Sequence, residues 1–371
     1  MYSESDLAQA VEAGILSPHA AEAFRNHVAA RGATQSADEE HFRLLTGFND
    51  IFVAIAASLM LVAVAWIGWY IAASVLMKGQ PGPVEFGATT ATAGFTVAVT
   101  SWLLAEYFTR QRRMALPSIL LLLGFVGGTL AGFGGVFGAN LPWLAEQFNA
   151  TTDVQNAQLA GGVLAIVGAL TALATYGHWK RFMVPITVAV GANTMVAIAV
   201  GLIMAFVPGA RDWMYPIVLT AGLIVFAVAM AWDMSDLERR TRRSDVAFWL
   251  HLAAAPLIAH PIFHMLGVLD GEIGITTALI VVGLYVAFAV LALAVDRRAL
   301  LVSSLVYVLW AMYTLFQSTG AVELSAALTG LVIGSALLML SAFWQPMRRG
   351  VVGVLGGLGD NLPPTHQPAM A

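Results

Sequence analysis

Ten long apolar runs divide this chain, each about as long as a helix that crosses a membrane. Such a helix needs about 20 mostly apolar residues, and it satisfies its own backbone polar groups where no water is present. The composition agrees, because 59% of the residues are hydrophobic and only 11% are charged. We therefore expect an all-α fold, a polytopic transmembrane helical bundle of about ten spans. The runs cover residues 50–77, 84–107, 115–138, 157–178, 182–207, 213–233, 246–268, 273–295, 299–318 and 322–345.

Basic residues occupy every second gap between these runs. Of the 18 Lys and Arg residues, all but Lys78 and Arg211 lie in those gaps or ahead of the first run. Loops rich in Lys and Arg stay in the cytoplasm, and this bias sets the orientation of a membrane protein. The pattern predicts that even-numbered spans end in the cytoplasm and that both termini lie there.

Residues 1–33 are expected to form a small cytoplasmic helical hairpin. Gly14 ends the first short helix, and Ser17-Pro18 supplies an N-cap and a proline at the start of the second. Two such helices bury too little surface to be stable alone, so we expect them to dock on the membrane domain, a protein partner or another copy. The predicted domains are the hairpin 1–33, a linker 34–49, a ten-span transmembrane domain 50–345 and a cytoplasmic tail 346–371.

The hairpin carries the one resemblance to known proteins. Asp6-Leu7, followed by Gly14-Ile15-Leu16-Ser17 and a second short helix ahead of many spans, resembles uncharacterised bacterial multi-span membrane proteins with a short N-terminal helical hairpin. This resemblance implies a multi-pass protein of the bacterial inner (plasma) membrane. It implies no catalytic residues.

Span seven differs from the other nine runs in its polar and helix-breaking residues. It holds His251, His260 and His264, three of the chain's eight histidines, together with Pro256 and Pro261. Ionisable residues within a membrane are costly and usually face the bundle interior or water. Each proline removes a backbone hydrogen bond and kinks the helix, which frees a carbonyl group. Span seven is therefore the candidate to line a ligand or proton pathway.

His260 and His264 are four residues apart and share a helix face, so they could pass a proton or bind one metal ion. Three interpretations stay open: the histidines fix helix packing, they form a proton or substrate path, or they hold a divalent metal or haem. Haem between two spans would need His178. Asn193 and Gln317 complete the candidate pathway, and no cofactor is expected.

An arginine cluster separates spans six and seven. Arg239, Arg240, Arg242 and Arg243 could contact lipid headgroups or another anionic ligand. The alternative is that they set the topology and form local salt bridges. The chain has no cysteine, which excludes disulfides and thiolate metal sites.

Span three is rich in glycine. Gly124, Gly128, Gly132 and Gly135 form small-xxx-small patterns, which let helix backbones approach closely in a membrane. They predict that span three packs at the centre of the bundle. The alternative is that a glycine-rich span moves against its neighbours.

These features give one leading hypothesis on function and two alternatives. The leading one is a membrane protein that transports or binds a small or lipid-like molecule through a site lined by span seven. The alternatives are a membrane-anchored scaffold or sensor that recruits a partner through residues 1–33, and a lipid-modifying enzyme that uses the arginine cluster. The sequence favours a protein that is not an enzyme, because no nucleophile and base stand at matched spacing. We expect the lipid bilayer as a partner and no nucleic acid.

Overall fold

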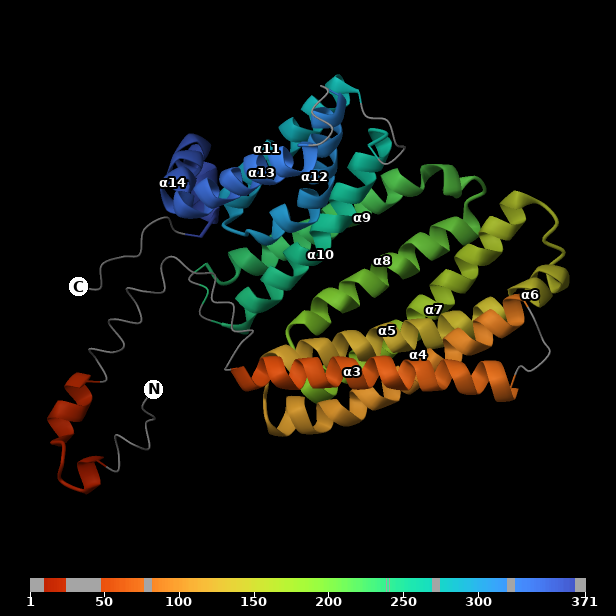
Figure 1. The fold of residues 1–371 in the computed structure, drawn as a ribbon, viewed down its shortest axis with the longest axis horizontal. Coiled ribbons are helices and arrows are strands. Elements are labelled where there is room, and N and C mark those ends of the chain that lie inside the picture. The colour runs from red at the N-terminus through yellow and green to blue at the C-terminus, as the bar shows by residue number, and fades with distance from the viewer. Residues whose placement is uncertain are drawn as a thin grey trace. The chain divides into compact units, whose positions relative to one another are not determined.

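In the computed structural model the chain divides into two units (Figure 1). One unit comprises residues 1–43 and 366–371, and the other comprises residues 44–365. The described residues are 10–24, 48–76, 82–237, 239, 241–268, 274–318 and 324–363.

The first unit is described over residues 10–24. Residues 10–12 and 18–24 are helical, and Gly14 between them has a φ of 70°. The backbone amide of Ala20 donates to Ser17 Oγ at 3.1 Å, a side-chain cap at the start of the second helix. The remainder of the predicted hairpin and residues 34–47 of the predicted linker lie outside the described residues.

The second unit contains ten helices that are long and apolar enough to cross a membrane, counted over the described residues, which confirms an all-helical, multi-span architecture. They are α3 (Phe48–Ile71), α4 (Pro83–Ala105), α5 (Ala115–Ala139), α7 (Asp153–Phe182), α8 (Ile186–Phe206), α9 (Met214–Met234), α10 (Arg242–Met265), α11 (Ile275–Val295), α12 (Ala299–Ser318) and α13 (Ser325–Ala342). The shorter elements are the π-helices η1 (Ala72–Leu76) and η2 (Glu106–Gln111), the 3₁₀-helices η3 (Ala210–Trp213) and η4 (Gly356–Asn361), and the helices α6 (Leu141–Gln147) and α14 (Trp344–Leu355). Part of the predicted tail 346–371 is helical, in α14 and in η4, which ends at Asn361.

The basic gaps converge on one end of this unit, which we name the basic end. Arg181 after α7 contacts Glu106 after α4, with Nε–Oε1 and Nη2–Oε2 distances of 2.6 and 2.9 Å. Arg297 after α11 binds Asp233 at the end of α9. Trp249 near the start of α10 packs with residues that follow α7. The other ends of the helices form the opposite end.

Helix α10 is the most enclosed of the ten membrane-compatible helices. Within its apolar stretch 61% of the residues are buried, compared with 39% in α5 and 17% in α3. It packs against α8, α9 and α12 (Figure 1). Its small side chains at Ala253, Ala254 and Ala255 are buried, which lets these neighbours come close. Helix α5, which is span three, packs against α3, α4 and α7. Its place at the centre of the bundle stays a prediction, and α10 has the larger buried share of the two.

Helices α4 and α5 meet along their glycines. A Cβ added to Gly128 would lie 2.6 Å from the carbonyl oxygen of Gly94, and one added to Gly94 would lie 2.4 Å from the amide nitrogen of Gly132. At Gly135 it would lie 2.4 Å from the amide of Ala91. These distances leave no room for a side chain, so the two backbones touch directly. The fourth predicted glycine, Gly124, faces the side chains of Ser101 and Leu61.

A second crossing of this kind, which the sequence analysis did not identify, joins α7 to α8. A Cβ on Gly161 would lie 2.8 Å from the carbonyl oxygen of Gly201, and one on Gly201 would lie 2.6 Å from the amide of Ala165. Close backbone approach thus holds both helix pairs in the first half of the unit.

Candidate functional site

His251 belongs to a buried ionic node at the basic end, made of Asp233, Ser244, His251 and Arg297. The Asp233 Oδ2 atom lies 2.8 Å from His251 Nε2 and accepts a hydrogen bond from Arg297 Nε at 3.1 Å. Arg297 Nη2 donates to Asp233 Oδ1 and, at 3.2 Å each, to the Ser244 carbonyl and hydroxyl oxygens. The side chains of His251, Asp233 and Arg297 are at most 3% exposed. An ionised carboxylate only accepts, so His251 carries its proton on Nε2.

The node pairs its charges internally. Asp233 and Arg297 carry opposite charges, and their hydrogen bonds compensate the cost of burial. His251 Nδ1 has no hydrogen-bond partner among the described residues. Because α9, α10 and the turn after α11 meet here, the arrangement fits helix packing better than a pathway for ions or substrates.

A second junction at the basic end centres on Asp296, in the turn between α11 and α12. Arg239 Nη1 donates to Asp296 Oδ2 at 2.9 Å, and Trp344 Nε1 donates to Oδ1 at 2.7 Å. Arg348 Nε lies 3.6 Å from the same oxygen. Burial lowers the pKa of Arg348, and the Asp296 carboxylate acts in the opposite direction. The junction connects the α9–α10 loop to α14.

The predicted arginine cluster is divided by this arrangement. Arg239 binds the turn after α11, because its Nη2 also donates to the carbonyls of Val295 and Asp296 at 3.1 Å each. Arg242 and Arg243 are exposed. Arg240 lies outside the described residues.

Six residues of these two groups are not among the predicted site residues: Asp233, Ser244, Asp296, Arg297, Trp344 and Arg348. Their signal in the sequence is weak. Each acid or arginine stands at the end of an apolar run, where it resembles an ordinary topology determinant. Opposite charges at the same predicted membrane border were the only available hint.

His260 and His264 lie near the opposite end and each contacts a tyrosine. His260 Nδ1 lies 2.7 Å from the hydroxyl of Tyr307 on α12. His264 stacks on Tyr215 of α9, with ring centroids 3.7 Å apart and an interplanar angle of 20°. The two imidazole centroids are 6.3 Å apart. We name these four residues the histidine–tyrosine cluster.

The cluster lacks the donor set of a metal site. Over the described residues, no group of three or more His, Cys, Asp or Glu side chains could hold a metal ion. Two imidazoles would have to share a metal with water or a ligand, because a protein metal site normally needs at least three donors. Gln317 donates to Tyr313 on the same helix at 2.7 Å, and Asn193 is exposed on α8.

Helix α10 runs continuously through Pro256 and Pro261. A proline at position 261 leaves the carbonyl of Leu257 without its helical donor. The backbone of α9 closes on this group, since a Cβ added to Gly222 would lie 2.9 Å from the Leu257 oxygen. The Leu257 carbonyl, which the proline leaves without a helical donor, is thereby covered by α9.

His178 on α7 is fully buried in an aromatic box. Its ring centroid lies 4.5 Å from that of Phe182, 5.4 Å from Phe125 and 6.0 Å from Trp102. Neither ring nitrogen has a hydrogen-bond partner within the described part of the chain. His178 was predicted only as a haem ligand opposite span seven, and the structure surrounds it with aromatic rings that make no hydrogen bond to it.

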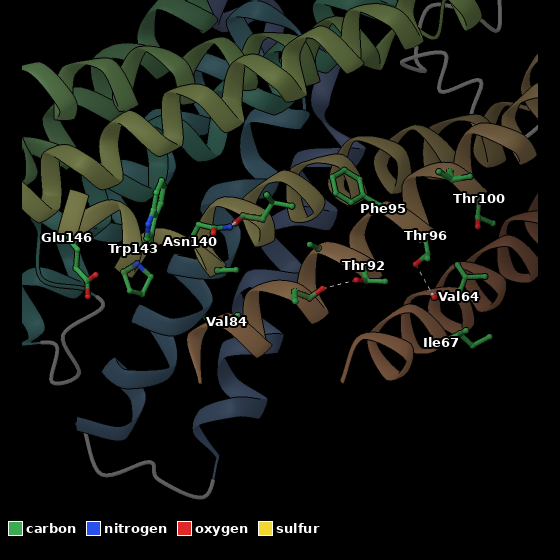
Figure 2. Close-up of a pocket in the computed structure, with 16 residues that line it drawn as sticks. Val64, Ile67, Val84, Thr92, Phe95, Thr96, Thr100, Asn140, Trp143 and Glu146 are labelled. Atoms are coloured by element: carbon green, nitrogen blue, oxygen red, sulfur yellow. Dashed lines mark hydrogen bonds between the residues drawn. The ribbon is translucent and has the colours of Figure 1, made fainter. Parts of the chain in front are cut away.

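A large apolar groove lies against α4, away from span seven, and we name it the α4 groove (Figure 2). Its volume is about 1230 Å³. None of its lining residues comes from α10. The lining comprises Val64, Ile67, Val84, Ala88, Ala91, Thr92, Phe95, Thr96, Val99, Thr100, Val136, Ala139, Asn140, Pro142, Trp143 and Glu146.

Two of the three threonines in the groove wall, Thr92 and Thr96, satisfy their hydroxyl groups within the protein. Thr92 Oγ1 donates to the carbonyl of Ala88 at 2.8 Å. Thr96 Oγ1 lies 2.8 Å from the Ala93 carbonyl oxygen and 3.1 Å from that of Val64, on α3 (Figure 2). The middle of the groove therefore presents a mainly apolar surface.

The polar groups of the α4 groove gather where α5 passes into α6. Asn140, Trp143 and Glu146 lie together at this end, whereas Thr96 and Thr100 lie toward the other (Figure 2). Trp143 is 57% exposed, and Glu146 forms no ion pair with any described residue. One end of an otherwise apolar groove thus carries a negative charge beside an indole ring.

The chain matches no protein-family model, and no curated protein or solved structure matches it either.

Proposed function

We propose that this multi-span membrane protein binds a lipid-like amphiphile in the α4 groove. The observation that carries the proposal is the groove itself, whose volume of about 1230 Å³ exceeds the roughly 300–1,000 Å³ of ordinary small-molecule pockets. Its wall on α4 runs from Val84 to Thr100, which corresponds to about 24 Å of helix. That length covers most of a hydrocarbon core of about 30 Å, so it suits an extended acyl or isoprenoid chain.

The polar end supports a cationic headgroup. The Glu146 carboxylate would pair with an ammonium group, and the Trp143 ring offers a face for a cation–π contact. The Asn140 side chain donates to the Val136 carbonyl at 2.8 Å, which keeps its amide beside the groove. An amphiphile with one long apolar chain and an amine head fits this arrangement, because its chain matches the apolar wall and its head matches the polar end of the groove.

The proposal keeps the lipid-like ligand predicted by the sequence but moves its site from span seven to helices α3–α6. The span-seven histidines contact Asp233, Tyr307 and Tyr215, which is consistent with a role in packing. The further step from binding to transport has no separate support in the groove.

Photolabelling tests the proposal. An alkylamine with a diazirine in its chain should label α4 and α5 of the wild-type protein in proteoliposomes. Filling the groove with Ala88→Trp or Val136→Trp should reduce labelling at least tenfold. Leu103→Trp is the matched control, because Leu103 lies on the same helix, is 65% exposed and does not line the groove. Equal labelling in the filled and control variants would overturn the proposal.

The headgroup is tested separately by comparing the alkylamine with a carboxylic acid of the same chain. Glu146→Gln should abolish the preference for the amine and leave labelling of the chain region unchanged. An unaltered preference would reject the headgroup assignment while leaving the chain site in place.

For orientation, we propose that the basic end faces the cytoplasm of a bacterium, with the protein in its inner membrane. The support is the convergence of five basic gaps on one end, together with the rule that such loops stay inside. A cysteine introduced at Arg349 should react with a membrane-impermeant maleimide only after the cells are opened. Reaction in intact cells would reverse the orientation.

A scaffold function through residues 1–33 is the second candidate, favoured by the capped helix that begins after Ser17. Deleting residues 1–33 should then remove a protein partner from pull-downs and leave photolabelling intact. Recovery of the same partner without these residues would exclude this role.

A further inference from the structure

Helix α14 has two different faces, and only one of them contacts the bundle. Trp344 and Arg348 are buried at 4% and 1% exposure. Phe343, Met347 and Val354 are 53%, 41% and 89% exposed. The three exposed residues are spaced by four and seven positions, so they fall on one stripe of the helix. We name Phe343, Met347 and Val354 the α14 stripe.

The bundle fixes the direction in which the α14 stripe points. Trp344 Nε1 donates to Asp296 Oδ1 at 2.7 Å, and Arg348 donates through Nη2 to the carbonyl of Pro363. The guanidinium carbon of Arg298 lies 4.8 Å above the centre of the Trp344 ring. These contacts lie on the buried face, so the stripe belongs to an anchored helix.

The position of α14 along the chain indicates what covers the stripe. Helix α13, which is apolar enough to cross a membrane, ends at Ala342, and α14 begins at Trp344. Only Phe343 separates the two helices, so α14 starts at the border of the hydrocarbon core. Amphipathic helices at this level lie in the plane of the membrane with their apolar face sunk about 5–10 Å into the acyl boundary.

We propose that α14 is an interfacial helix that binds the surface of the same bilayer at the basic end, with the α14 stripe among the acyl chains. Arg349 is exposed and lies off the stripe, where its side chain reaches toward anionic headgroups. The occupant of the stripe is a lipid surface that contains anionic lipid. This inference goes beyond the α4 groove, which lies on other helices.

Single-cysteine spin labels test the proposal, since the chain has no native cysteine. Labels at Met347→Cys and Val354→Cys in liposomes that contain phosphatidylglycerol should collide more often with oxygen than with a water-soluble nickel chelate. Arg349→Cys, on the same helix but off the stripe, is the matched control and should show the reverse. Equal exposure of positions 349 and 354 to the nickel chelate would overturn the proposal.

Two further measurements distinguish the other occupants. Dilution with unlabelled protein should leave the Val354→Cys spectrum unchanged, and a loss of spin–spin broadening on dilution would assign the stripe to a second copy. The immersion depth of position 354 should increase with the phosphatidylglycerol content in otherwise wild-type protein. Arg349→Gln should remove that dependence, and its persistence would refute the role of anionic lipid.

Discussion

The α4–α5 crossing and the α9–α10 crossing solve the same physical problem in different ways. Lipid is as apolar as the helices, so it supplies no hydrophobic drive for them to associate. At α4–α5 the backbones touch, because Gly94, Gly128 and Gly132 leave no side chain between them. At α9–α10 the backbones also come close at Gly222, but the pair is held in addition at its basic end by Asp233 and His251, with Arg297 completing the contact.

The two kinds of packing should respond differently to substitution. A substitution at a glycine contact weakens the packing by degrees, whereas loss of one charge from the ionic node leaves the other charges unbalanced. Close backbone contact is stabilised by many weak dispersion attractions between atoms. A buried ion pair contributes little net energy while complete, but it is strongly destabilising when one partner is lost. The enclosed helix α10 should therefore be the more sensitive of the two regions to single substitutions.

The largest effect is expected for Asp233→Ala. It leaves Arg297 and His251 buried without their acceptor, which should lower the free energy of unfolding by about 3–5 kcal/mol. Thermal unfolding in detergent measures the change. Asp212→Ala, at an exposed position in η3, is the control and should stay near wild type.

The same comparison is sharpened by the double variant Asp233→Leu with Arg297→Met. Replacing both charges by apolar side chains removes the unpaired group, so the double variant should be more stable than Asp233→Ala. If the double variant is less stable than Asp233→Ala, the ionic node contributes to the free energy of unfolding beyond balancing the charges of Asp233 and Arg297.

A smaller effect is expected for Gly128→Ala at the α4–α5 crossing. The added methyl group would meet the backbone of Gly94 and Ala98 at 2.6 and 2.7 Å, which forces the helices apart. We expect a loss of about 1–3 kcal/mol in the free energy of unfolding. Gly127→Ala is the matched control, because a Cβ there meets open space. If both variants lose the same free energy of unfolding, close backbone approach is not what joins α4 and α5.

The smallest effect is expected for His178→Phe. Its ring nitrogens are unpaired and its neighbours are aromatic, so phenylalanine should keep stability within about 1 kcal/mol of wild type or raise it. His251→Phe is the contrasting variant, because it removes a hydrogen bond to Asp233. Equal losses of unfolding free energy at the two positions would remove the distinction between a satisfied and an unsatisfied buried histidine.

The number and type of the spans could be predicted because run length and composition are local properties of the chain. The glycines of span three are also a local feature, because each one marks a position where another helix can approach the backbone closely. The partner of each helix is not local information. Nothing in the sequence says that Gly128 meets Gly94 on α4, or that span seven becomes the most enclosed helix.

The α4 groove and the buried ionic node depend on that missing information. Trp143 and Glu146 line the same groove as Val64 and Thr96 only because α3–α6 are arranged side by side in space. Likewise, Asp233 and Arg297 are separated by 64 residues. Each of them looks like an ordinary residue at the end of its own span.

That separation sets an order of events during synthesis. Chains are made at about 5–20 residues per second, so about 3–13 s pass between the addition of Asp233 and that of Arg297. Helix α10 is completed within this interval, so α9 and α10 then exist together while the carboxylate that joins them still lacks its arginine. The second half of the bundle therefore closes only after α11 has been made, whereas α4 and α5 can pair as soon as their own hairpin is inserted.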